Sequence, residues 1–237
     1  MFAFRHLPPL PALRDWPSQC LICRAWPART LCAHCTGRFA LPITRCEGCA
    51  LPVPPGVLRC GACLRHPSPV DHCLVALSYA WPWTACIARL KFQQDVGLAG
   101  PLAALLAQAP GVAEALQTAD RLVPMPLAPE RLGERGYNPA LLLARQLDRR
   151  RCDSDVLLRV RNTPPQRGLS REQRQRNVRG AFAVHPAQAA HLQGQHVVLL
   201  DDVMTTGASL YEAARCLRQA GAGQITALAL ARTEESR

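Results

Sequence analysis

The sequence predicts an α/β protein: a parallel-sheet domain preceded by a small cysteine-rich module that binds metal. Two observations predict this architecture. Four Cys-x-x-Cys pairs fall within residues 20–63, and beyond residue 70 short apolar strands alternate with helices. The chain has 237 residues, of which 49% are hydrophobic and 19% charged. It is therefore long and apolar enough to bury a core, and a largely disordered chain is excluded.

We expect three segments: a Pro-rich stretch at 1–19, the cysteine module at 20–69 and the α/β domain at 70–237. The first stretch contains four prolines and lacks the continuous apolar core of a secretory signal. No run approaches the roughly 18–20 uncharged apolar residues of a membrane span. We therefore expect a cytoplasmic protein without membrane insertion. In that reducing compartment, paired cysteines bind metal more often than they form disulfides.

The cysteine pairs have the spacing of metal-binding knuckles. A two-residue gap lets both thiolates of a tight turn reach one ion, and two knuckles complete a tetrahedral site. The gaps between successive pairs are 8, 10 and 10 residues, so 20–35 and 46–63 resemble two copies of one unit. We expect two structural zinc ions, held by Cys20, Cys23, Cys32, Cys35, Cys46, Cys49, Cys60 and Cys63.

The same cysteine spacing also occurs in redox motifs and in iron–sulfur sites. A thioredoxin-like redox motif occurs singly beside a strand–helix pattern, whereas this region is rich in proline and glycine; iron–sulfur ligation stays open. Pairing of adjacent knuckles closes the shortest loops and is preferred, although interleaved pairing fits the same spacing. We expect His34 and His66 to lie outside the metal sites. The single cysteines are expected to pack as small apolar residues: Cys73, Cys86, Cys152 and Cys216.

The net charge of +11 is unevenly distributed. Residues 1–70 carry eight basic and two acidic side chains, and residues 121–180 carry fourteen and six. Such blocks suit phosphate-rich partners, either a nucleotide or a nucleic acid. Because 27 of the 28 basic residues are arginine, with Lys91 as the exception, a compositional bias is an alternative explanation of the excess.

The α/β half is expected to form a parallel sheet with right-handed crossovers, because strand and helix patterns alternate along it. The predicted strands cover 72–80, 121–126, 156–160, 196–203 and 224–232. The predicted helices cover 84–92, 96–108, 139–150 and 208–219.

The segment VVLLDDVMTTGAS at 197–209 is the most informative one. Four apolar residues fit a central strand, and Asp201 and Asp202 follow at its C-terminal end, where open α/β sheets bind ligands. A loop of small, hydroxyl-rich residues then leads into a helix, whose free N–H groups suit a phosphate. The alternative, a capped helix with two solvated acids, leaves the acids directly above the loop unexplained. We expect that neither carboxylate needs to be buried.

This segment resembles the signature of type I phosphoribosyltransferases, which bind 5-phosphoribosyl-1-pyrophosphate (PRPP). The resemblance implies that Asp201 and Asp202 face the ribose hydroxyls. It also implies that the following loop holds the 5′-phosphate through Thr205, Thr206, Gly207, Ala208 and Ser209.

Two further stretches are similar to the ComF family. VPMPL at 123–127, followed by Arg131 and RGYN at 135–138, resembles the family's "VPVPL…R…RGFNQA" segment, although Pro139 replaces a common glutamine. The stretch 163–182 resembles "T..Q..L….R..N..GAF", and Tyr79 with Leu90-Lys91-Phe92 fits "Y…LKF". The chain is thus identified as a ComF family member: a double zinc ribbon joined to a phosphoribosyltransferase-like domain.

The resemblance implies further site residues. Pro124, Met125, Arg131 and Arg135 would lie at the loop that holds pyrophosphate. Residues 167–179 would form a mobile lid in which Arg174 takes a catalytic part with Asp201 and Asp202. The alternative for these lid arginines is a solvated helix face.

Two functions from different classes follow. The first is a Mg²⁺-dependent phosphoribosyl transferase, in which Mg²⁺ and arginines neutralise the departing pyrophosphate. The second is a non-catalytic module that binds single-stranded DNA and senses PRPP, since the family is associated with DNA uptake and natural transformation. In that case the DNA-uptake machinery is a partner. Four tryptophans would then stack on bases; the alternative is that they pack within the protein: Trp16, Trp26, Trp81 and Trp83.

Overall fold

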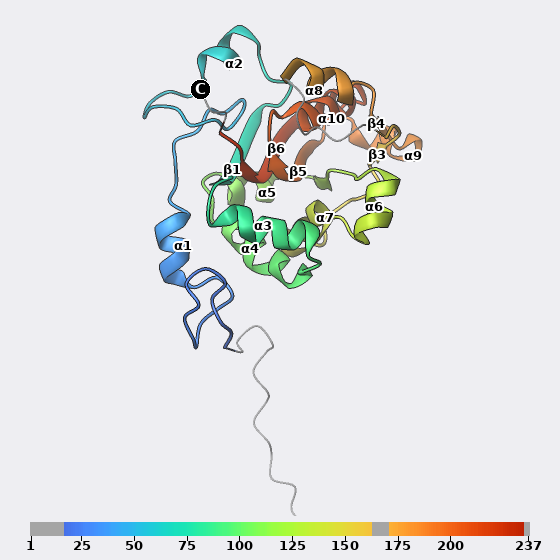
Figure 1. Ribbon diagram of the computed structural model, residues 1–237. Helices are drawn as coiled ribbons and strands as arrows, with labels where there is room; N and C mark the ends of the chain where they lie inside the picture. The colour runs from blue at the N-terminus through green and yellow to red at the C-terminus, as the bar shows by residue number, and fades with distance from the viewer. Residues whose placement is uncertain (1–16, 163–170, 235–237) are drawn as a thin grey trace, which may run out of the picture.

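The computed structural model describes residues 17–162 and 171–234. Its centre is a four-stranded sheet with strand order β1-β6-β5-β2, and every neighbouring pair is parallel (Figure 1). The expected parallel α/β fold is confirmed. The strands are β1 (His72–Ser78), β2 (Arg121–Pro124), β5 (His196–Met204) and β6 (Gln224–Arg232).

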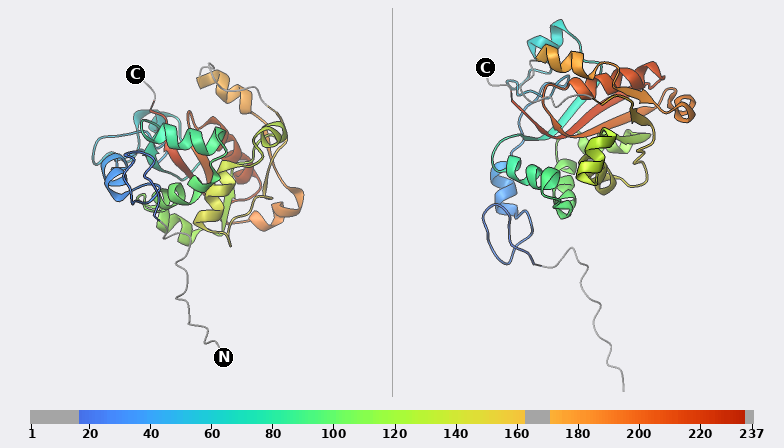
Figure 2. Two further views of the ribbon diagram at one scale, coloured as in Figure 1. Left: turned by 60° about the horizontal axis from the view of Figure 1, so that its bottom comes forward. Right: turned by 45° about the vertical axis from the view of Figure 1, so that its right-hand side comes forward.

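Helices cover both faces of this sheet (Figures 1 and 2). On one face a core of buried residues joins the sheet to α3 (Trp83–Phe92), α4 (Ala99–Ala107), α5 (Val112–Thr118) and α7 (Pro139–Leu147). On the other face a second core joins it to α10 (Ala208–Gln219). Because both faces are covered, the central strands are continuous apolar runs, as is typical of parallel sheets.

The described chain also contains elements that the sequence pattern did not predict. They are α5, α6 (Pro129–Arg135), α9 (Pro186–Ala189) and the short strand β4 (Phe182–Val184). β4 pairs antiparallel with β3 (Leu157–Arg159), apart from the main sheet. These elements have seven residues or fewer, too few for a clear helical or strand period.

Element boundaries otherwise shift by a few residues. The helix expected over 96–108 begins as the 3₁₀ turn η2 (Val96–Leu98) and continues as α4, and a second such turn, η3 (Ala190–Leu192), precedes β5. The stretch expected to form a lid contains a helix, α8 (Arg171–Val178). Residues 163–170 of that stretch lie outside the described residues, so the predicted mobility of the lid stays a prediction.

The parallel sheet brings two loops to one edge. β2 pairs with β5 so that Pro124 lies opposite Leu200, and Met125 N–H donates to the Leu200 carbonyl at 2.8 Å. Both strands run toward the same edge, and there each gives way to its loop. The segments that follow β2 and β5 therefore meet, as expected for a ligand site of an open α/β sheet.

Two cysteine modules precede the sheet and lie apart from each other (Figures 1 and 2). The first carries α1 (Ala33–Phe39) and packs near α3, where the Trp83 indole N–H donates to the Phe39 carbonyl at 2.8 Å. The second carries α2 (Gly61–Arg65) and lies near α10, where the Tyr211 hydroxyl donates to the Gly48 carbonyl at 3.0 Å. Leu31 and Ala50 are parts of the two main cores, so both modules share their packing with the α/β domain.

Among the described residues no single helix has the length and apolar character to cross a membrane. Two successive helical segments, 96–107 and 112–118, together have the length and composition of a membrane span. Their axes are bent by 96° relative to each other.

Candidate functional site

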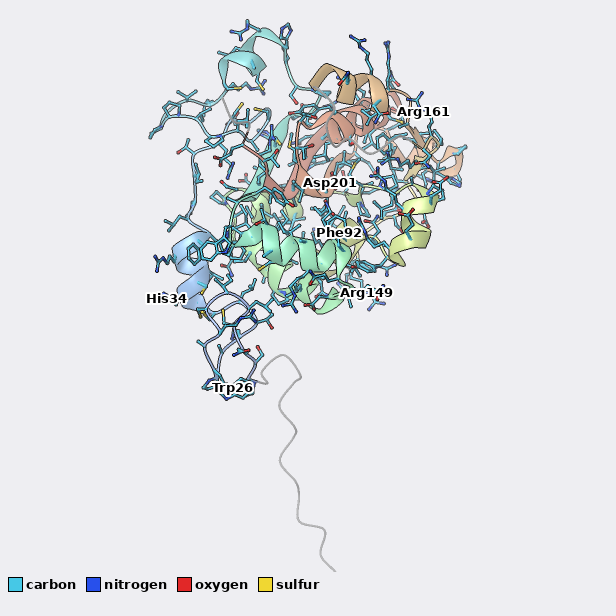
Figure 3. The ribbon with its side chains drawn as sticks, viewed as in Figure 1. Trp26, His34, Phe92, Arg149, Arg161 and Asp201 are labelled. Carbon is cyan, nitrogen blue, oxygen red and sulfur yellow. The ribbon has the colours of Figure 1, made fainter. Side chains whose placement is uncertain are left out.

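A cavity of about 830 Å³ lies at the edge where β2 and β5 end. Four elements build its walls: the end of α3, the loop after β2 with α6, the strand β3, and the β5–α10 loop. Figure 3 shows Asp201 between the sheet and α3, on which Phe92 lies. The predicted site residues that line it are Met125, Arg131, Arg135, Asp201, Asp202, Thr205, Gly207, Ala208 and Ser209.

The two carboxylates at the end of β5 have different surroundings. Asp202 is 7% exposed, and its Oδ1 accepts from Lys91 Nζ at 2.7 Å. Asp201 is half-buried, and its Oδ1 accepts from the Asp202 backbone N–H at 2.8 Å. Burial and repulsion from Asp202 raise the pKa of Asp201 to about 7, although Lys91 acts in the opposite direction. Burial alone would lower the pKa of Lys91, but the Asp202 carboxylate holds it above its ordinary value.

The expectation that neither carboxylate needs burial is wrong for Asp202. A buried carboxylate requires a partner, and the partner is a lysine 111 residues away in the sequence. Lys91 is the single lysine of the chain, and the sequence pattern predicts no site role for it. Its rarity in an arginine-rich sequence was the available signal.

The loop after β5 has the conformation expected of a phosphate site. Gly207 stands at the N-cap of α10 with φ of +80°, a left-handed conformation that favours glycine. A Cβ there would lie 2.6 Å from the Met204 methyl and 2.7 Å from the Tyr211 ring. The Thr206 hydroxyl accepts from Ala208 N–H at 3.4 Å, so Thr206 supports the loop from inside and does not line the cavity.

Arginines form the opposite wall. Arg131 and Arg135 belong to α6, and the Arg135 guanidinium lies 5.3 Å from the centre of the Phe92 ring. Arg159 on β3 also lines the cavity, and burial together with the neighbouring Arg131 lowers its pKa. No local pattern in the sequence indicates Arg159, because it is one arginine among 27 and its strand is short.

The RGYN motif positions this wall. Gly136 ends α6 with φ of +78°, and the Tyr137 hydroxyl donates to the Leu90 carbonyl of α3. The Asn138 side chain accepts from the N–H groups of the first turn of α7 and donates to the Met125 carbonyl at 2.9 Å. Pro139 is buried at the start of α7, where a missing N–H is harmless, so its departure from the family pattern is compatible with the fold.

Three predicted site residues are not among those that line the described cavity, and Thr206 is one of them. Pro124 is the last residue of β2 and does not line the cavity. Arg174 belongs to α8, and its side chain lies outside the described residues. The catalytic role assigned to Arg174 therefore stays a prediction.

The eight knuckle cysteines gather into two groups of four. Within each group the sulfur atoms all lie within 4.8 Å of one another. Sγ–Sγ distances of 3.7 Å, between Cys23 and Cys32 and between Cys49 and Cys60, match the roughly 3.8 Å edge of a tetrahedron with 2.3 Å Zn–S bonds. Each group can hold one zinc ion, and adjacent knuckles pair as preferred from the spacing: Cys20, Cys23, Cys32, Cys35, and Cys46, Cys49, Cys60, Cys63.

The protein prepares one thiolate in each group. Burial alone would raise the pKa of the Cys20 thiol, but backbone N–H groups directed at its sulfur lower that pKa to about 6. The Cys60 N–H donates to Cys46 Sγ at 3.2 Å, and such contacts outweigh burial and lower the pKa of Cys46 to about 7. Metal ligands must be deprotonated, and burial raises the pKa of Cys35 to about 12 and that of Cys49 to about 11, so a cation at either group must displace protons from the remaining thiols.

The remaining histidines and cysteines agree with expectation. His34 and His66 are exposed and belong to neither four-cysteine group (Figure 3 labels His34). Cys73 and Cys86 are each 4% exposed and pack in the cores. The other two single cysteines, Cys152 and Cys216, are half-buried.

Comparisons with known proteins agree with this architecture. The profile of the phosphoribosyl transferase domain matches residues 132–237. DNA utilization protein YhgH of Escherichia coli (strain K12) is 34% identical over 226 residues, covering 92% of this chain and 98% of that protein.

Two relatives are named for competence. Competence protein F of Haemophilus influenzae is 32% identical over 209 residues, covering 85% of this chain and 90% of that protein. Competence protein ComFC of Bacillus subtilis is 35% identical over 113 residues, covering 47% of this chain and 44% of that protein. Similarity along nearly the whole length, together with the two cysteine groups, leads to one conclusion: the chain belongs to the ComF family.

Proposed function

We propose that this protein binds PRPP with Mg²⁺ in the cavity at the sheet edge and transfers its phosphoribosyl group, in a process of DNA uptake or use. One observation carries the proposal. A carboxylate pair and a left-handed glycine loop at a helix start lie across one cavity from three arginines. A sugar with an anionic group at each end needs this arrangement of charges.

The residues divide the ligand between them. Asp201 and Asp202 accept from the ribose hydroxyls and place negative charge beside the sugar carbon that becomes cationic as its bond to pyrophosphate breaks. The first turn of α10, at Ala208 and Ser209, binds the 5′-phosphate. The arginine wall stabilises the pyrophosphate as it leaves: Arg131, Arg135 and Arg159.

Magnesium fits this donor set, because hard carboxylate oxygens line the cavity and Mg²⁺ takes its other ligands from phosphate oxygens and water. Asp201 and Asp202 would hold the ion, directly or through ribose hydroxyls. When bound, Mg²⁺ neutralises charge on the leaving pyrophosphate.

We also propose that each four-cysteine group binds one structural zinc ion. Thiolate sites of this kind persist in a reducing compartment, which supports a cytoplasmic location. Elemental analysis of untagged protein is expected to give two zinc ions per chain, and one or none would contradict the assignment.

Isothermal calorimetry with PRPP and Mg²⁺, together with an assay of pyrophosphate release, tests the proposal. Arg135→Ala is expected to weaken PRPP binding by at least about tenfold, since one charge-assisted contact contributes roughly 1.5–3 kcal/mol. Arg145→Ala is the matched control, because Arg145 is exposed on α7 and does not line the cavity. Absence of PRPP binding by the wild-type protein would refute the proposal.

A second candidate function rests on exposed aromatic side chains. Trp26 and Trp81 are 65% and 69% exposed, and Trp81 meets Phe39 edge-to-face with ring centres 5.1 Å apart. The Arg38 guanidinium lies 5.3 Å from the Phe39 ring centre. Exposed rings beside cations are typical of surfaces that stack single-stranded bases, so we propose single-stranded DNA as a partner. Trp83 is buried and structural, and Trp16 lies outside the described residues.

Calorimetry with single-stranded DNA separates the two functions. DNA binding with a steep salt dependence and PRPP binding without pyrophosphate release would favour a module that senses PRPP. Pyrophosphate release would favour the enzyme.

A further inference from the structure

We propose that the second four-cysteine group positions the loop between β5 and α10, residues 204–209, which we call the phosphate loop. Metal at this group and ligand in the cavity would then bind cooperatively. The group consists of Cys46, Cys49, Cys60 and Cys63. The ligand arm of this inference rests on the proposed PRPP site. Two side chains, Arg232 and Tyr211, make the connection.

Arg232 is the first connection. It is the last residue of β6, it is 2% exposed, and its guanidinium touches two segments that are far apart in the sequence. Its Nε donates to the Cys49 carbonyl at 3.0 Å, inside the third knuckle. Its Nη1 donates to the Met204 carbonyl at 3.4 Å and to the Thr205 carbonyl, both at the start of the phosphate loop. One rigid, planar group thus fixes the knuckle backbone and the loop backbone relative to each other.

Tyr211 is the second connection. Its ring lies on Gly207, since a Cβ on that glycine would be 2.7 Å from the ring, and its hydroxyl donates to the Gly48 carbonyl at 3.0 Å. Gly48 is itself enclosed, because a Cβ there would lie 3.1 Å from Cys63 Sγ. Tyr211 therefore contacts Gly207 of the loop with its ring and Gly48 of the knuckle with its hydroxyl.

The first four-cysteine group supplies an internal comparison. Its module contacts α3, through the bond from Trp83 to the Phe39 carbonyl and through Leu31 in the core. The contacts of Arg232 and Tyr211 run to the second group. A loop whose shape depends on the second group must, by reciprocity, stabilise that group when a ligand holds the loop.

Cysteine alkylation followed by peptide mass spectrometry measures each group separately in the zinc-loaded full chain. PRPP with Mg²⁺ is expected to slow alkylation of the second group at least about threefold and to leave the first group unchanged. Calorimetry on the same sample reports whether PRPP binds. Binding without selective protection overturns the cooperativity, whereas absence of binding overturns the proposed PRPP site.

A ligand-free arm tests the connection itself. Tyr211→Phe removes one buried hydrogen bond and keeps the ring, so we expect alkylation of the second group to accelerate about fivefold. Tyr137→Phe is the matched control, because it removes a hydroxyl bond to the Leu90 carbonyl, away from the second group. Equal alkylation of the second group in Tyr211→Phe and wild type would overturn the inference.

A second variant changes a residue of the loop instead of Tyr211. Gly207→Ala forces the loop against Tyr211 and Met204, and we expect it to accelerate alkylation of the second group while the first group keeps its wild-type rate. Acceleration of both groups in either variant would mean general unfolding and would contradict a specific connection.

Discussion

The two cysteine modules have the same knuckle spacing but different attachments. The second module lies against the β5–α10 loop, and Cys46, Cys49 and Cys63 are buried. The first module lies against α3, extends away from the sheet with Trp26 near its far end, and leaves Cys23 exposed (Figure 3). Two cysteine groups with the same spacing thus have different surroundings: one contacts the β5–α10 loop, and the other leaves aromatic side chains exposed.

The two modules also meet different walls of the cavity. The first module contacts the beginning of α3, where Trp83 donates to the Phe39 carbonyl. Near the end of the same helix, Lys91 pairs with Asp202. The second module holds the start of the β5–α10 loop. Predictions that separate these walls therefore test the comparison.

The largest expected effect is the loss of a ligand from the second group. Cys46→Ser should release its zinc and lower the melting temperature of the whole chain by about 10 °C or more, because Ala50 and Arg232 join this module to the sheet. Cys23→Ser should also release one zinc but disturb the α/β domain less. Thermal unfolding with zinc analysis measures both, and equal losses of stability would break the comparison.

The next effect concerns the ion pair between α3 and β5. Asp202→Asn leaves the buried Lys91 ammonium without its carboxylate, so we expect a loss of about 3–5 kcal/mol in the free energy of unfolding. Asp201→Asn removes a carboxyl group that burial already disfavours, and should leave stability at pH 8 unchanged or higher. Urea denaturation measures the difference. Lys91→Met combined with Asp202→Asn should recover part of the loss, and a loss in Asp201→Asn equal to that in Asp202→Asn would contradict the assignment.

A smaller effect depends on pH. The pKa of Asp201 is raised to about 7, so the folded state holds a proton that the unfolded state releases near its ordinary value of 3.8. The contribution of Asp201 to stability is therefore greatest at low pH and is lost as pH rises from about 4 to 7.

Binding of PRPP with Mg²⁺ needs the carboxylate and should strengthen between pH 6 and 8. Asp201→Asn should flatten this dependence in calorimetry, and an unchanged pH profile would contradict it.

The smallest expected effect is on the exposed aromatic surface. Trp81→Ala should weaken binding of single-stranded DNA by about 1–3 kcal/mol, the contribution of one stacked base, and leave PRPP binding unchanged. Leu64→Ala, on the second module and similarly exposed at 68%, is the control. Equal effects of the two substitutions would show that the modules do not differ in DNA binding.

Local patterns in the sequence predicted the parts of the fold that depend on neighbours in the chain. Four apolar residues predict the buried strand β5. The two acids and the small residues after them predict the loop that follows this strand. α10 occupies 208–219, the range expected from its pattern. The cysteine groups were equally local, since each group spans fewer than twenty residues.

The rest depends on distances that the sequence pattern does not encode. The Lys91–Asp202 pair joins residues 111 positions apart, and the Arg232 contact to Cys49 joins residues 183 apart. Burial of Asp202 is favourable only because that distant lysine is present. Arg159 lines the cavity from β3, which pairs with β4, and these two three-residue strands carry almost no periodic signal.

The position of β6 in the sheet has a consequence for synthesis of the protein. This strand is made last, yet it lies between β1 and β5 and ends at Arg232. A chain growing on the ribosome can fill its first cysteine group early, because that group closes within residues 20–35. The complete sheet and the contacts of Arg232 with Cys49 and the β5–α10 loop form only after residues 224–232 have left the ribosome. A chain truncated before 224 should therefore contain the first cysteine group without the completed sheet.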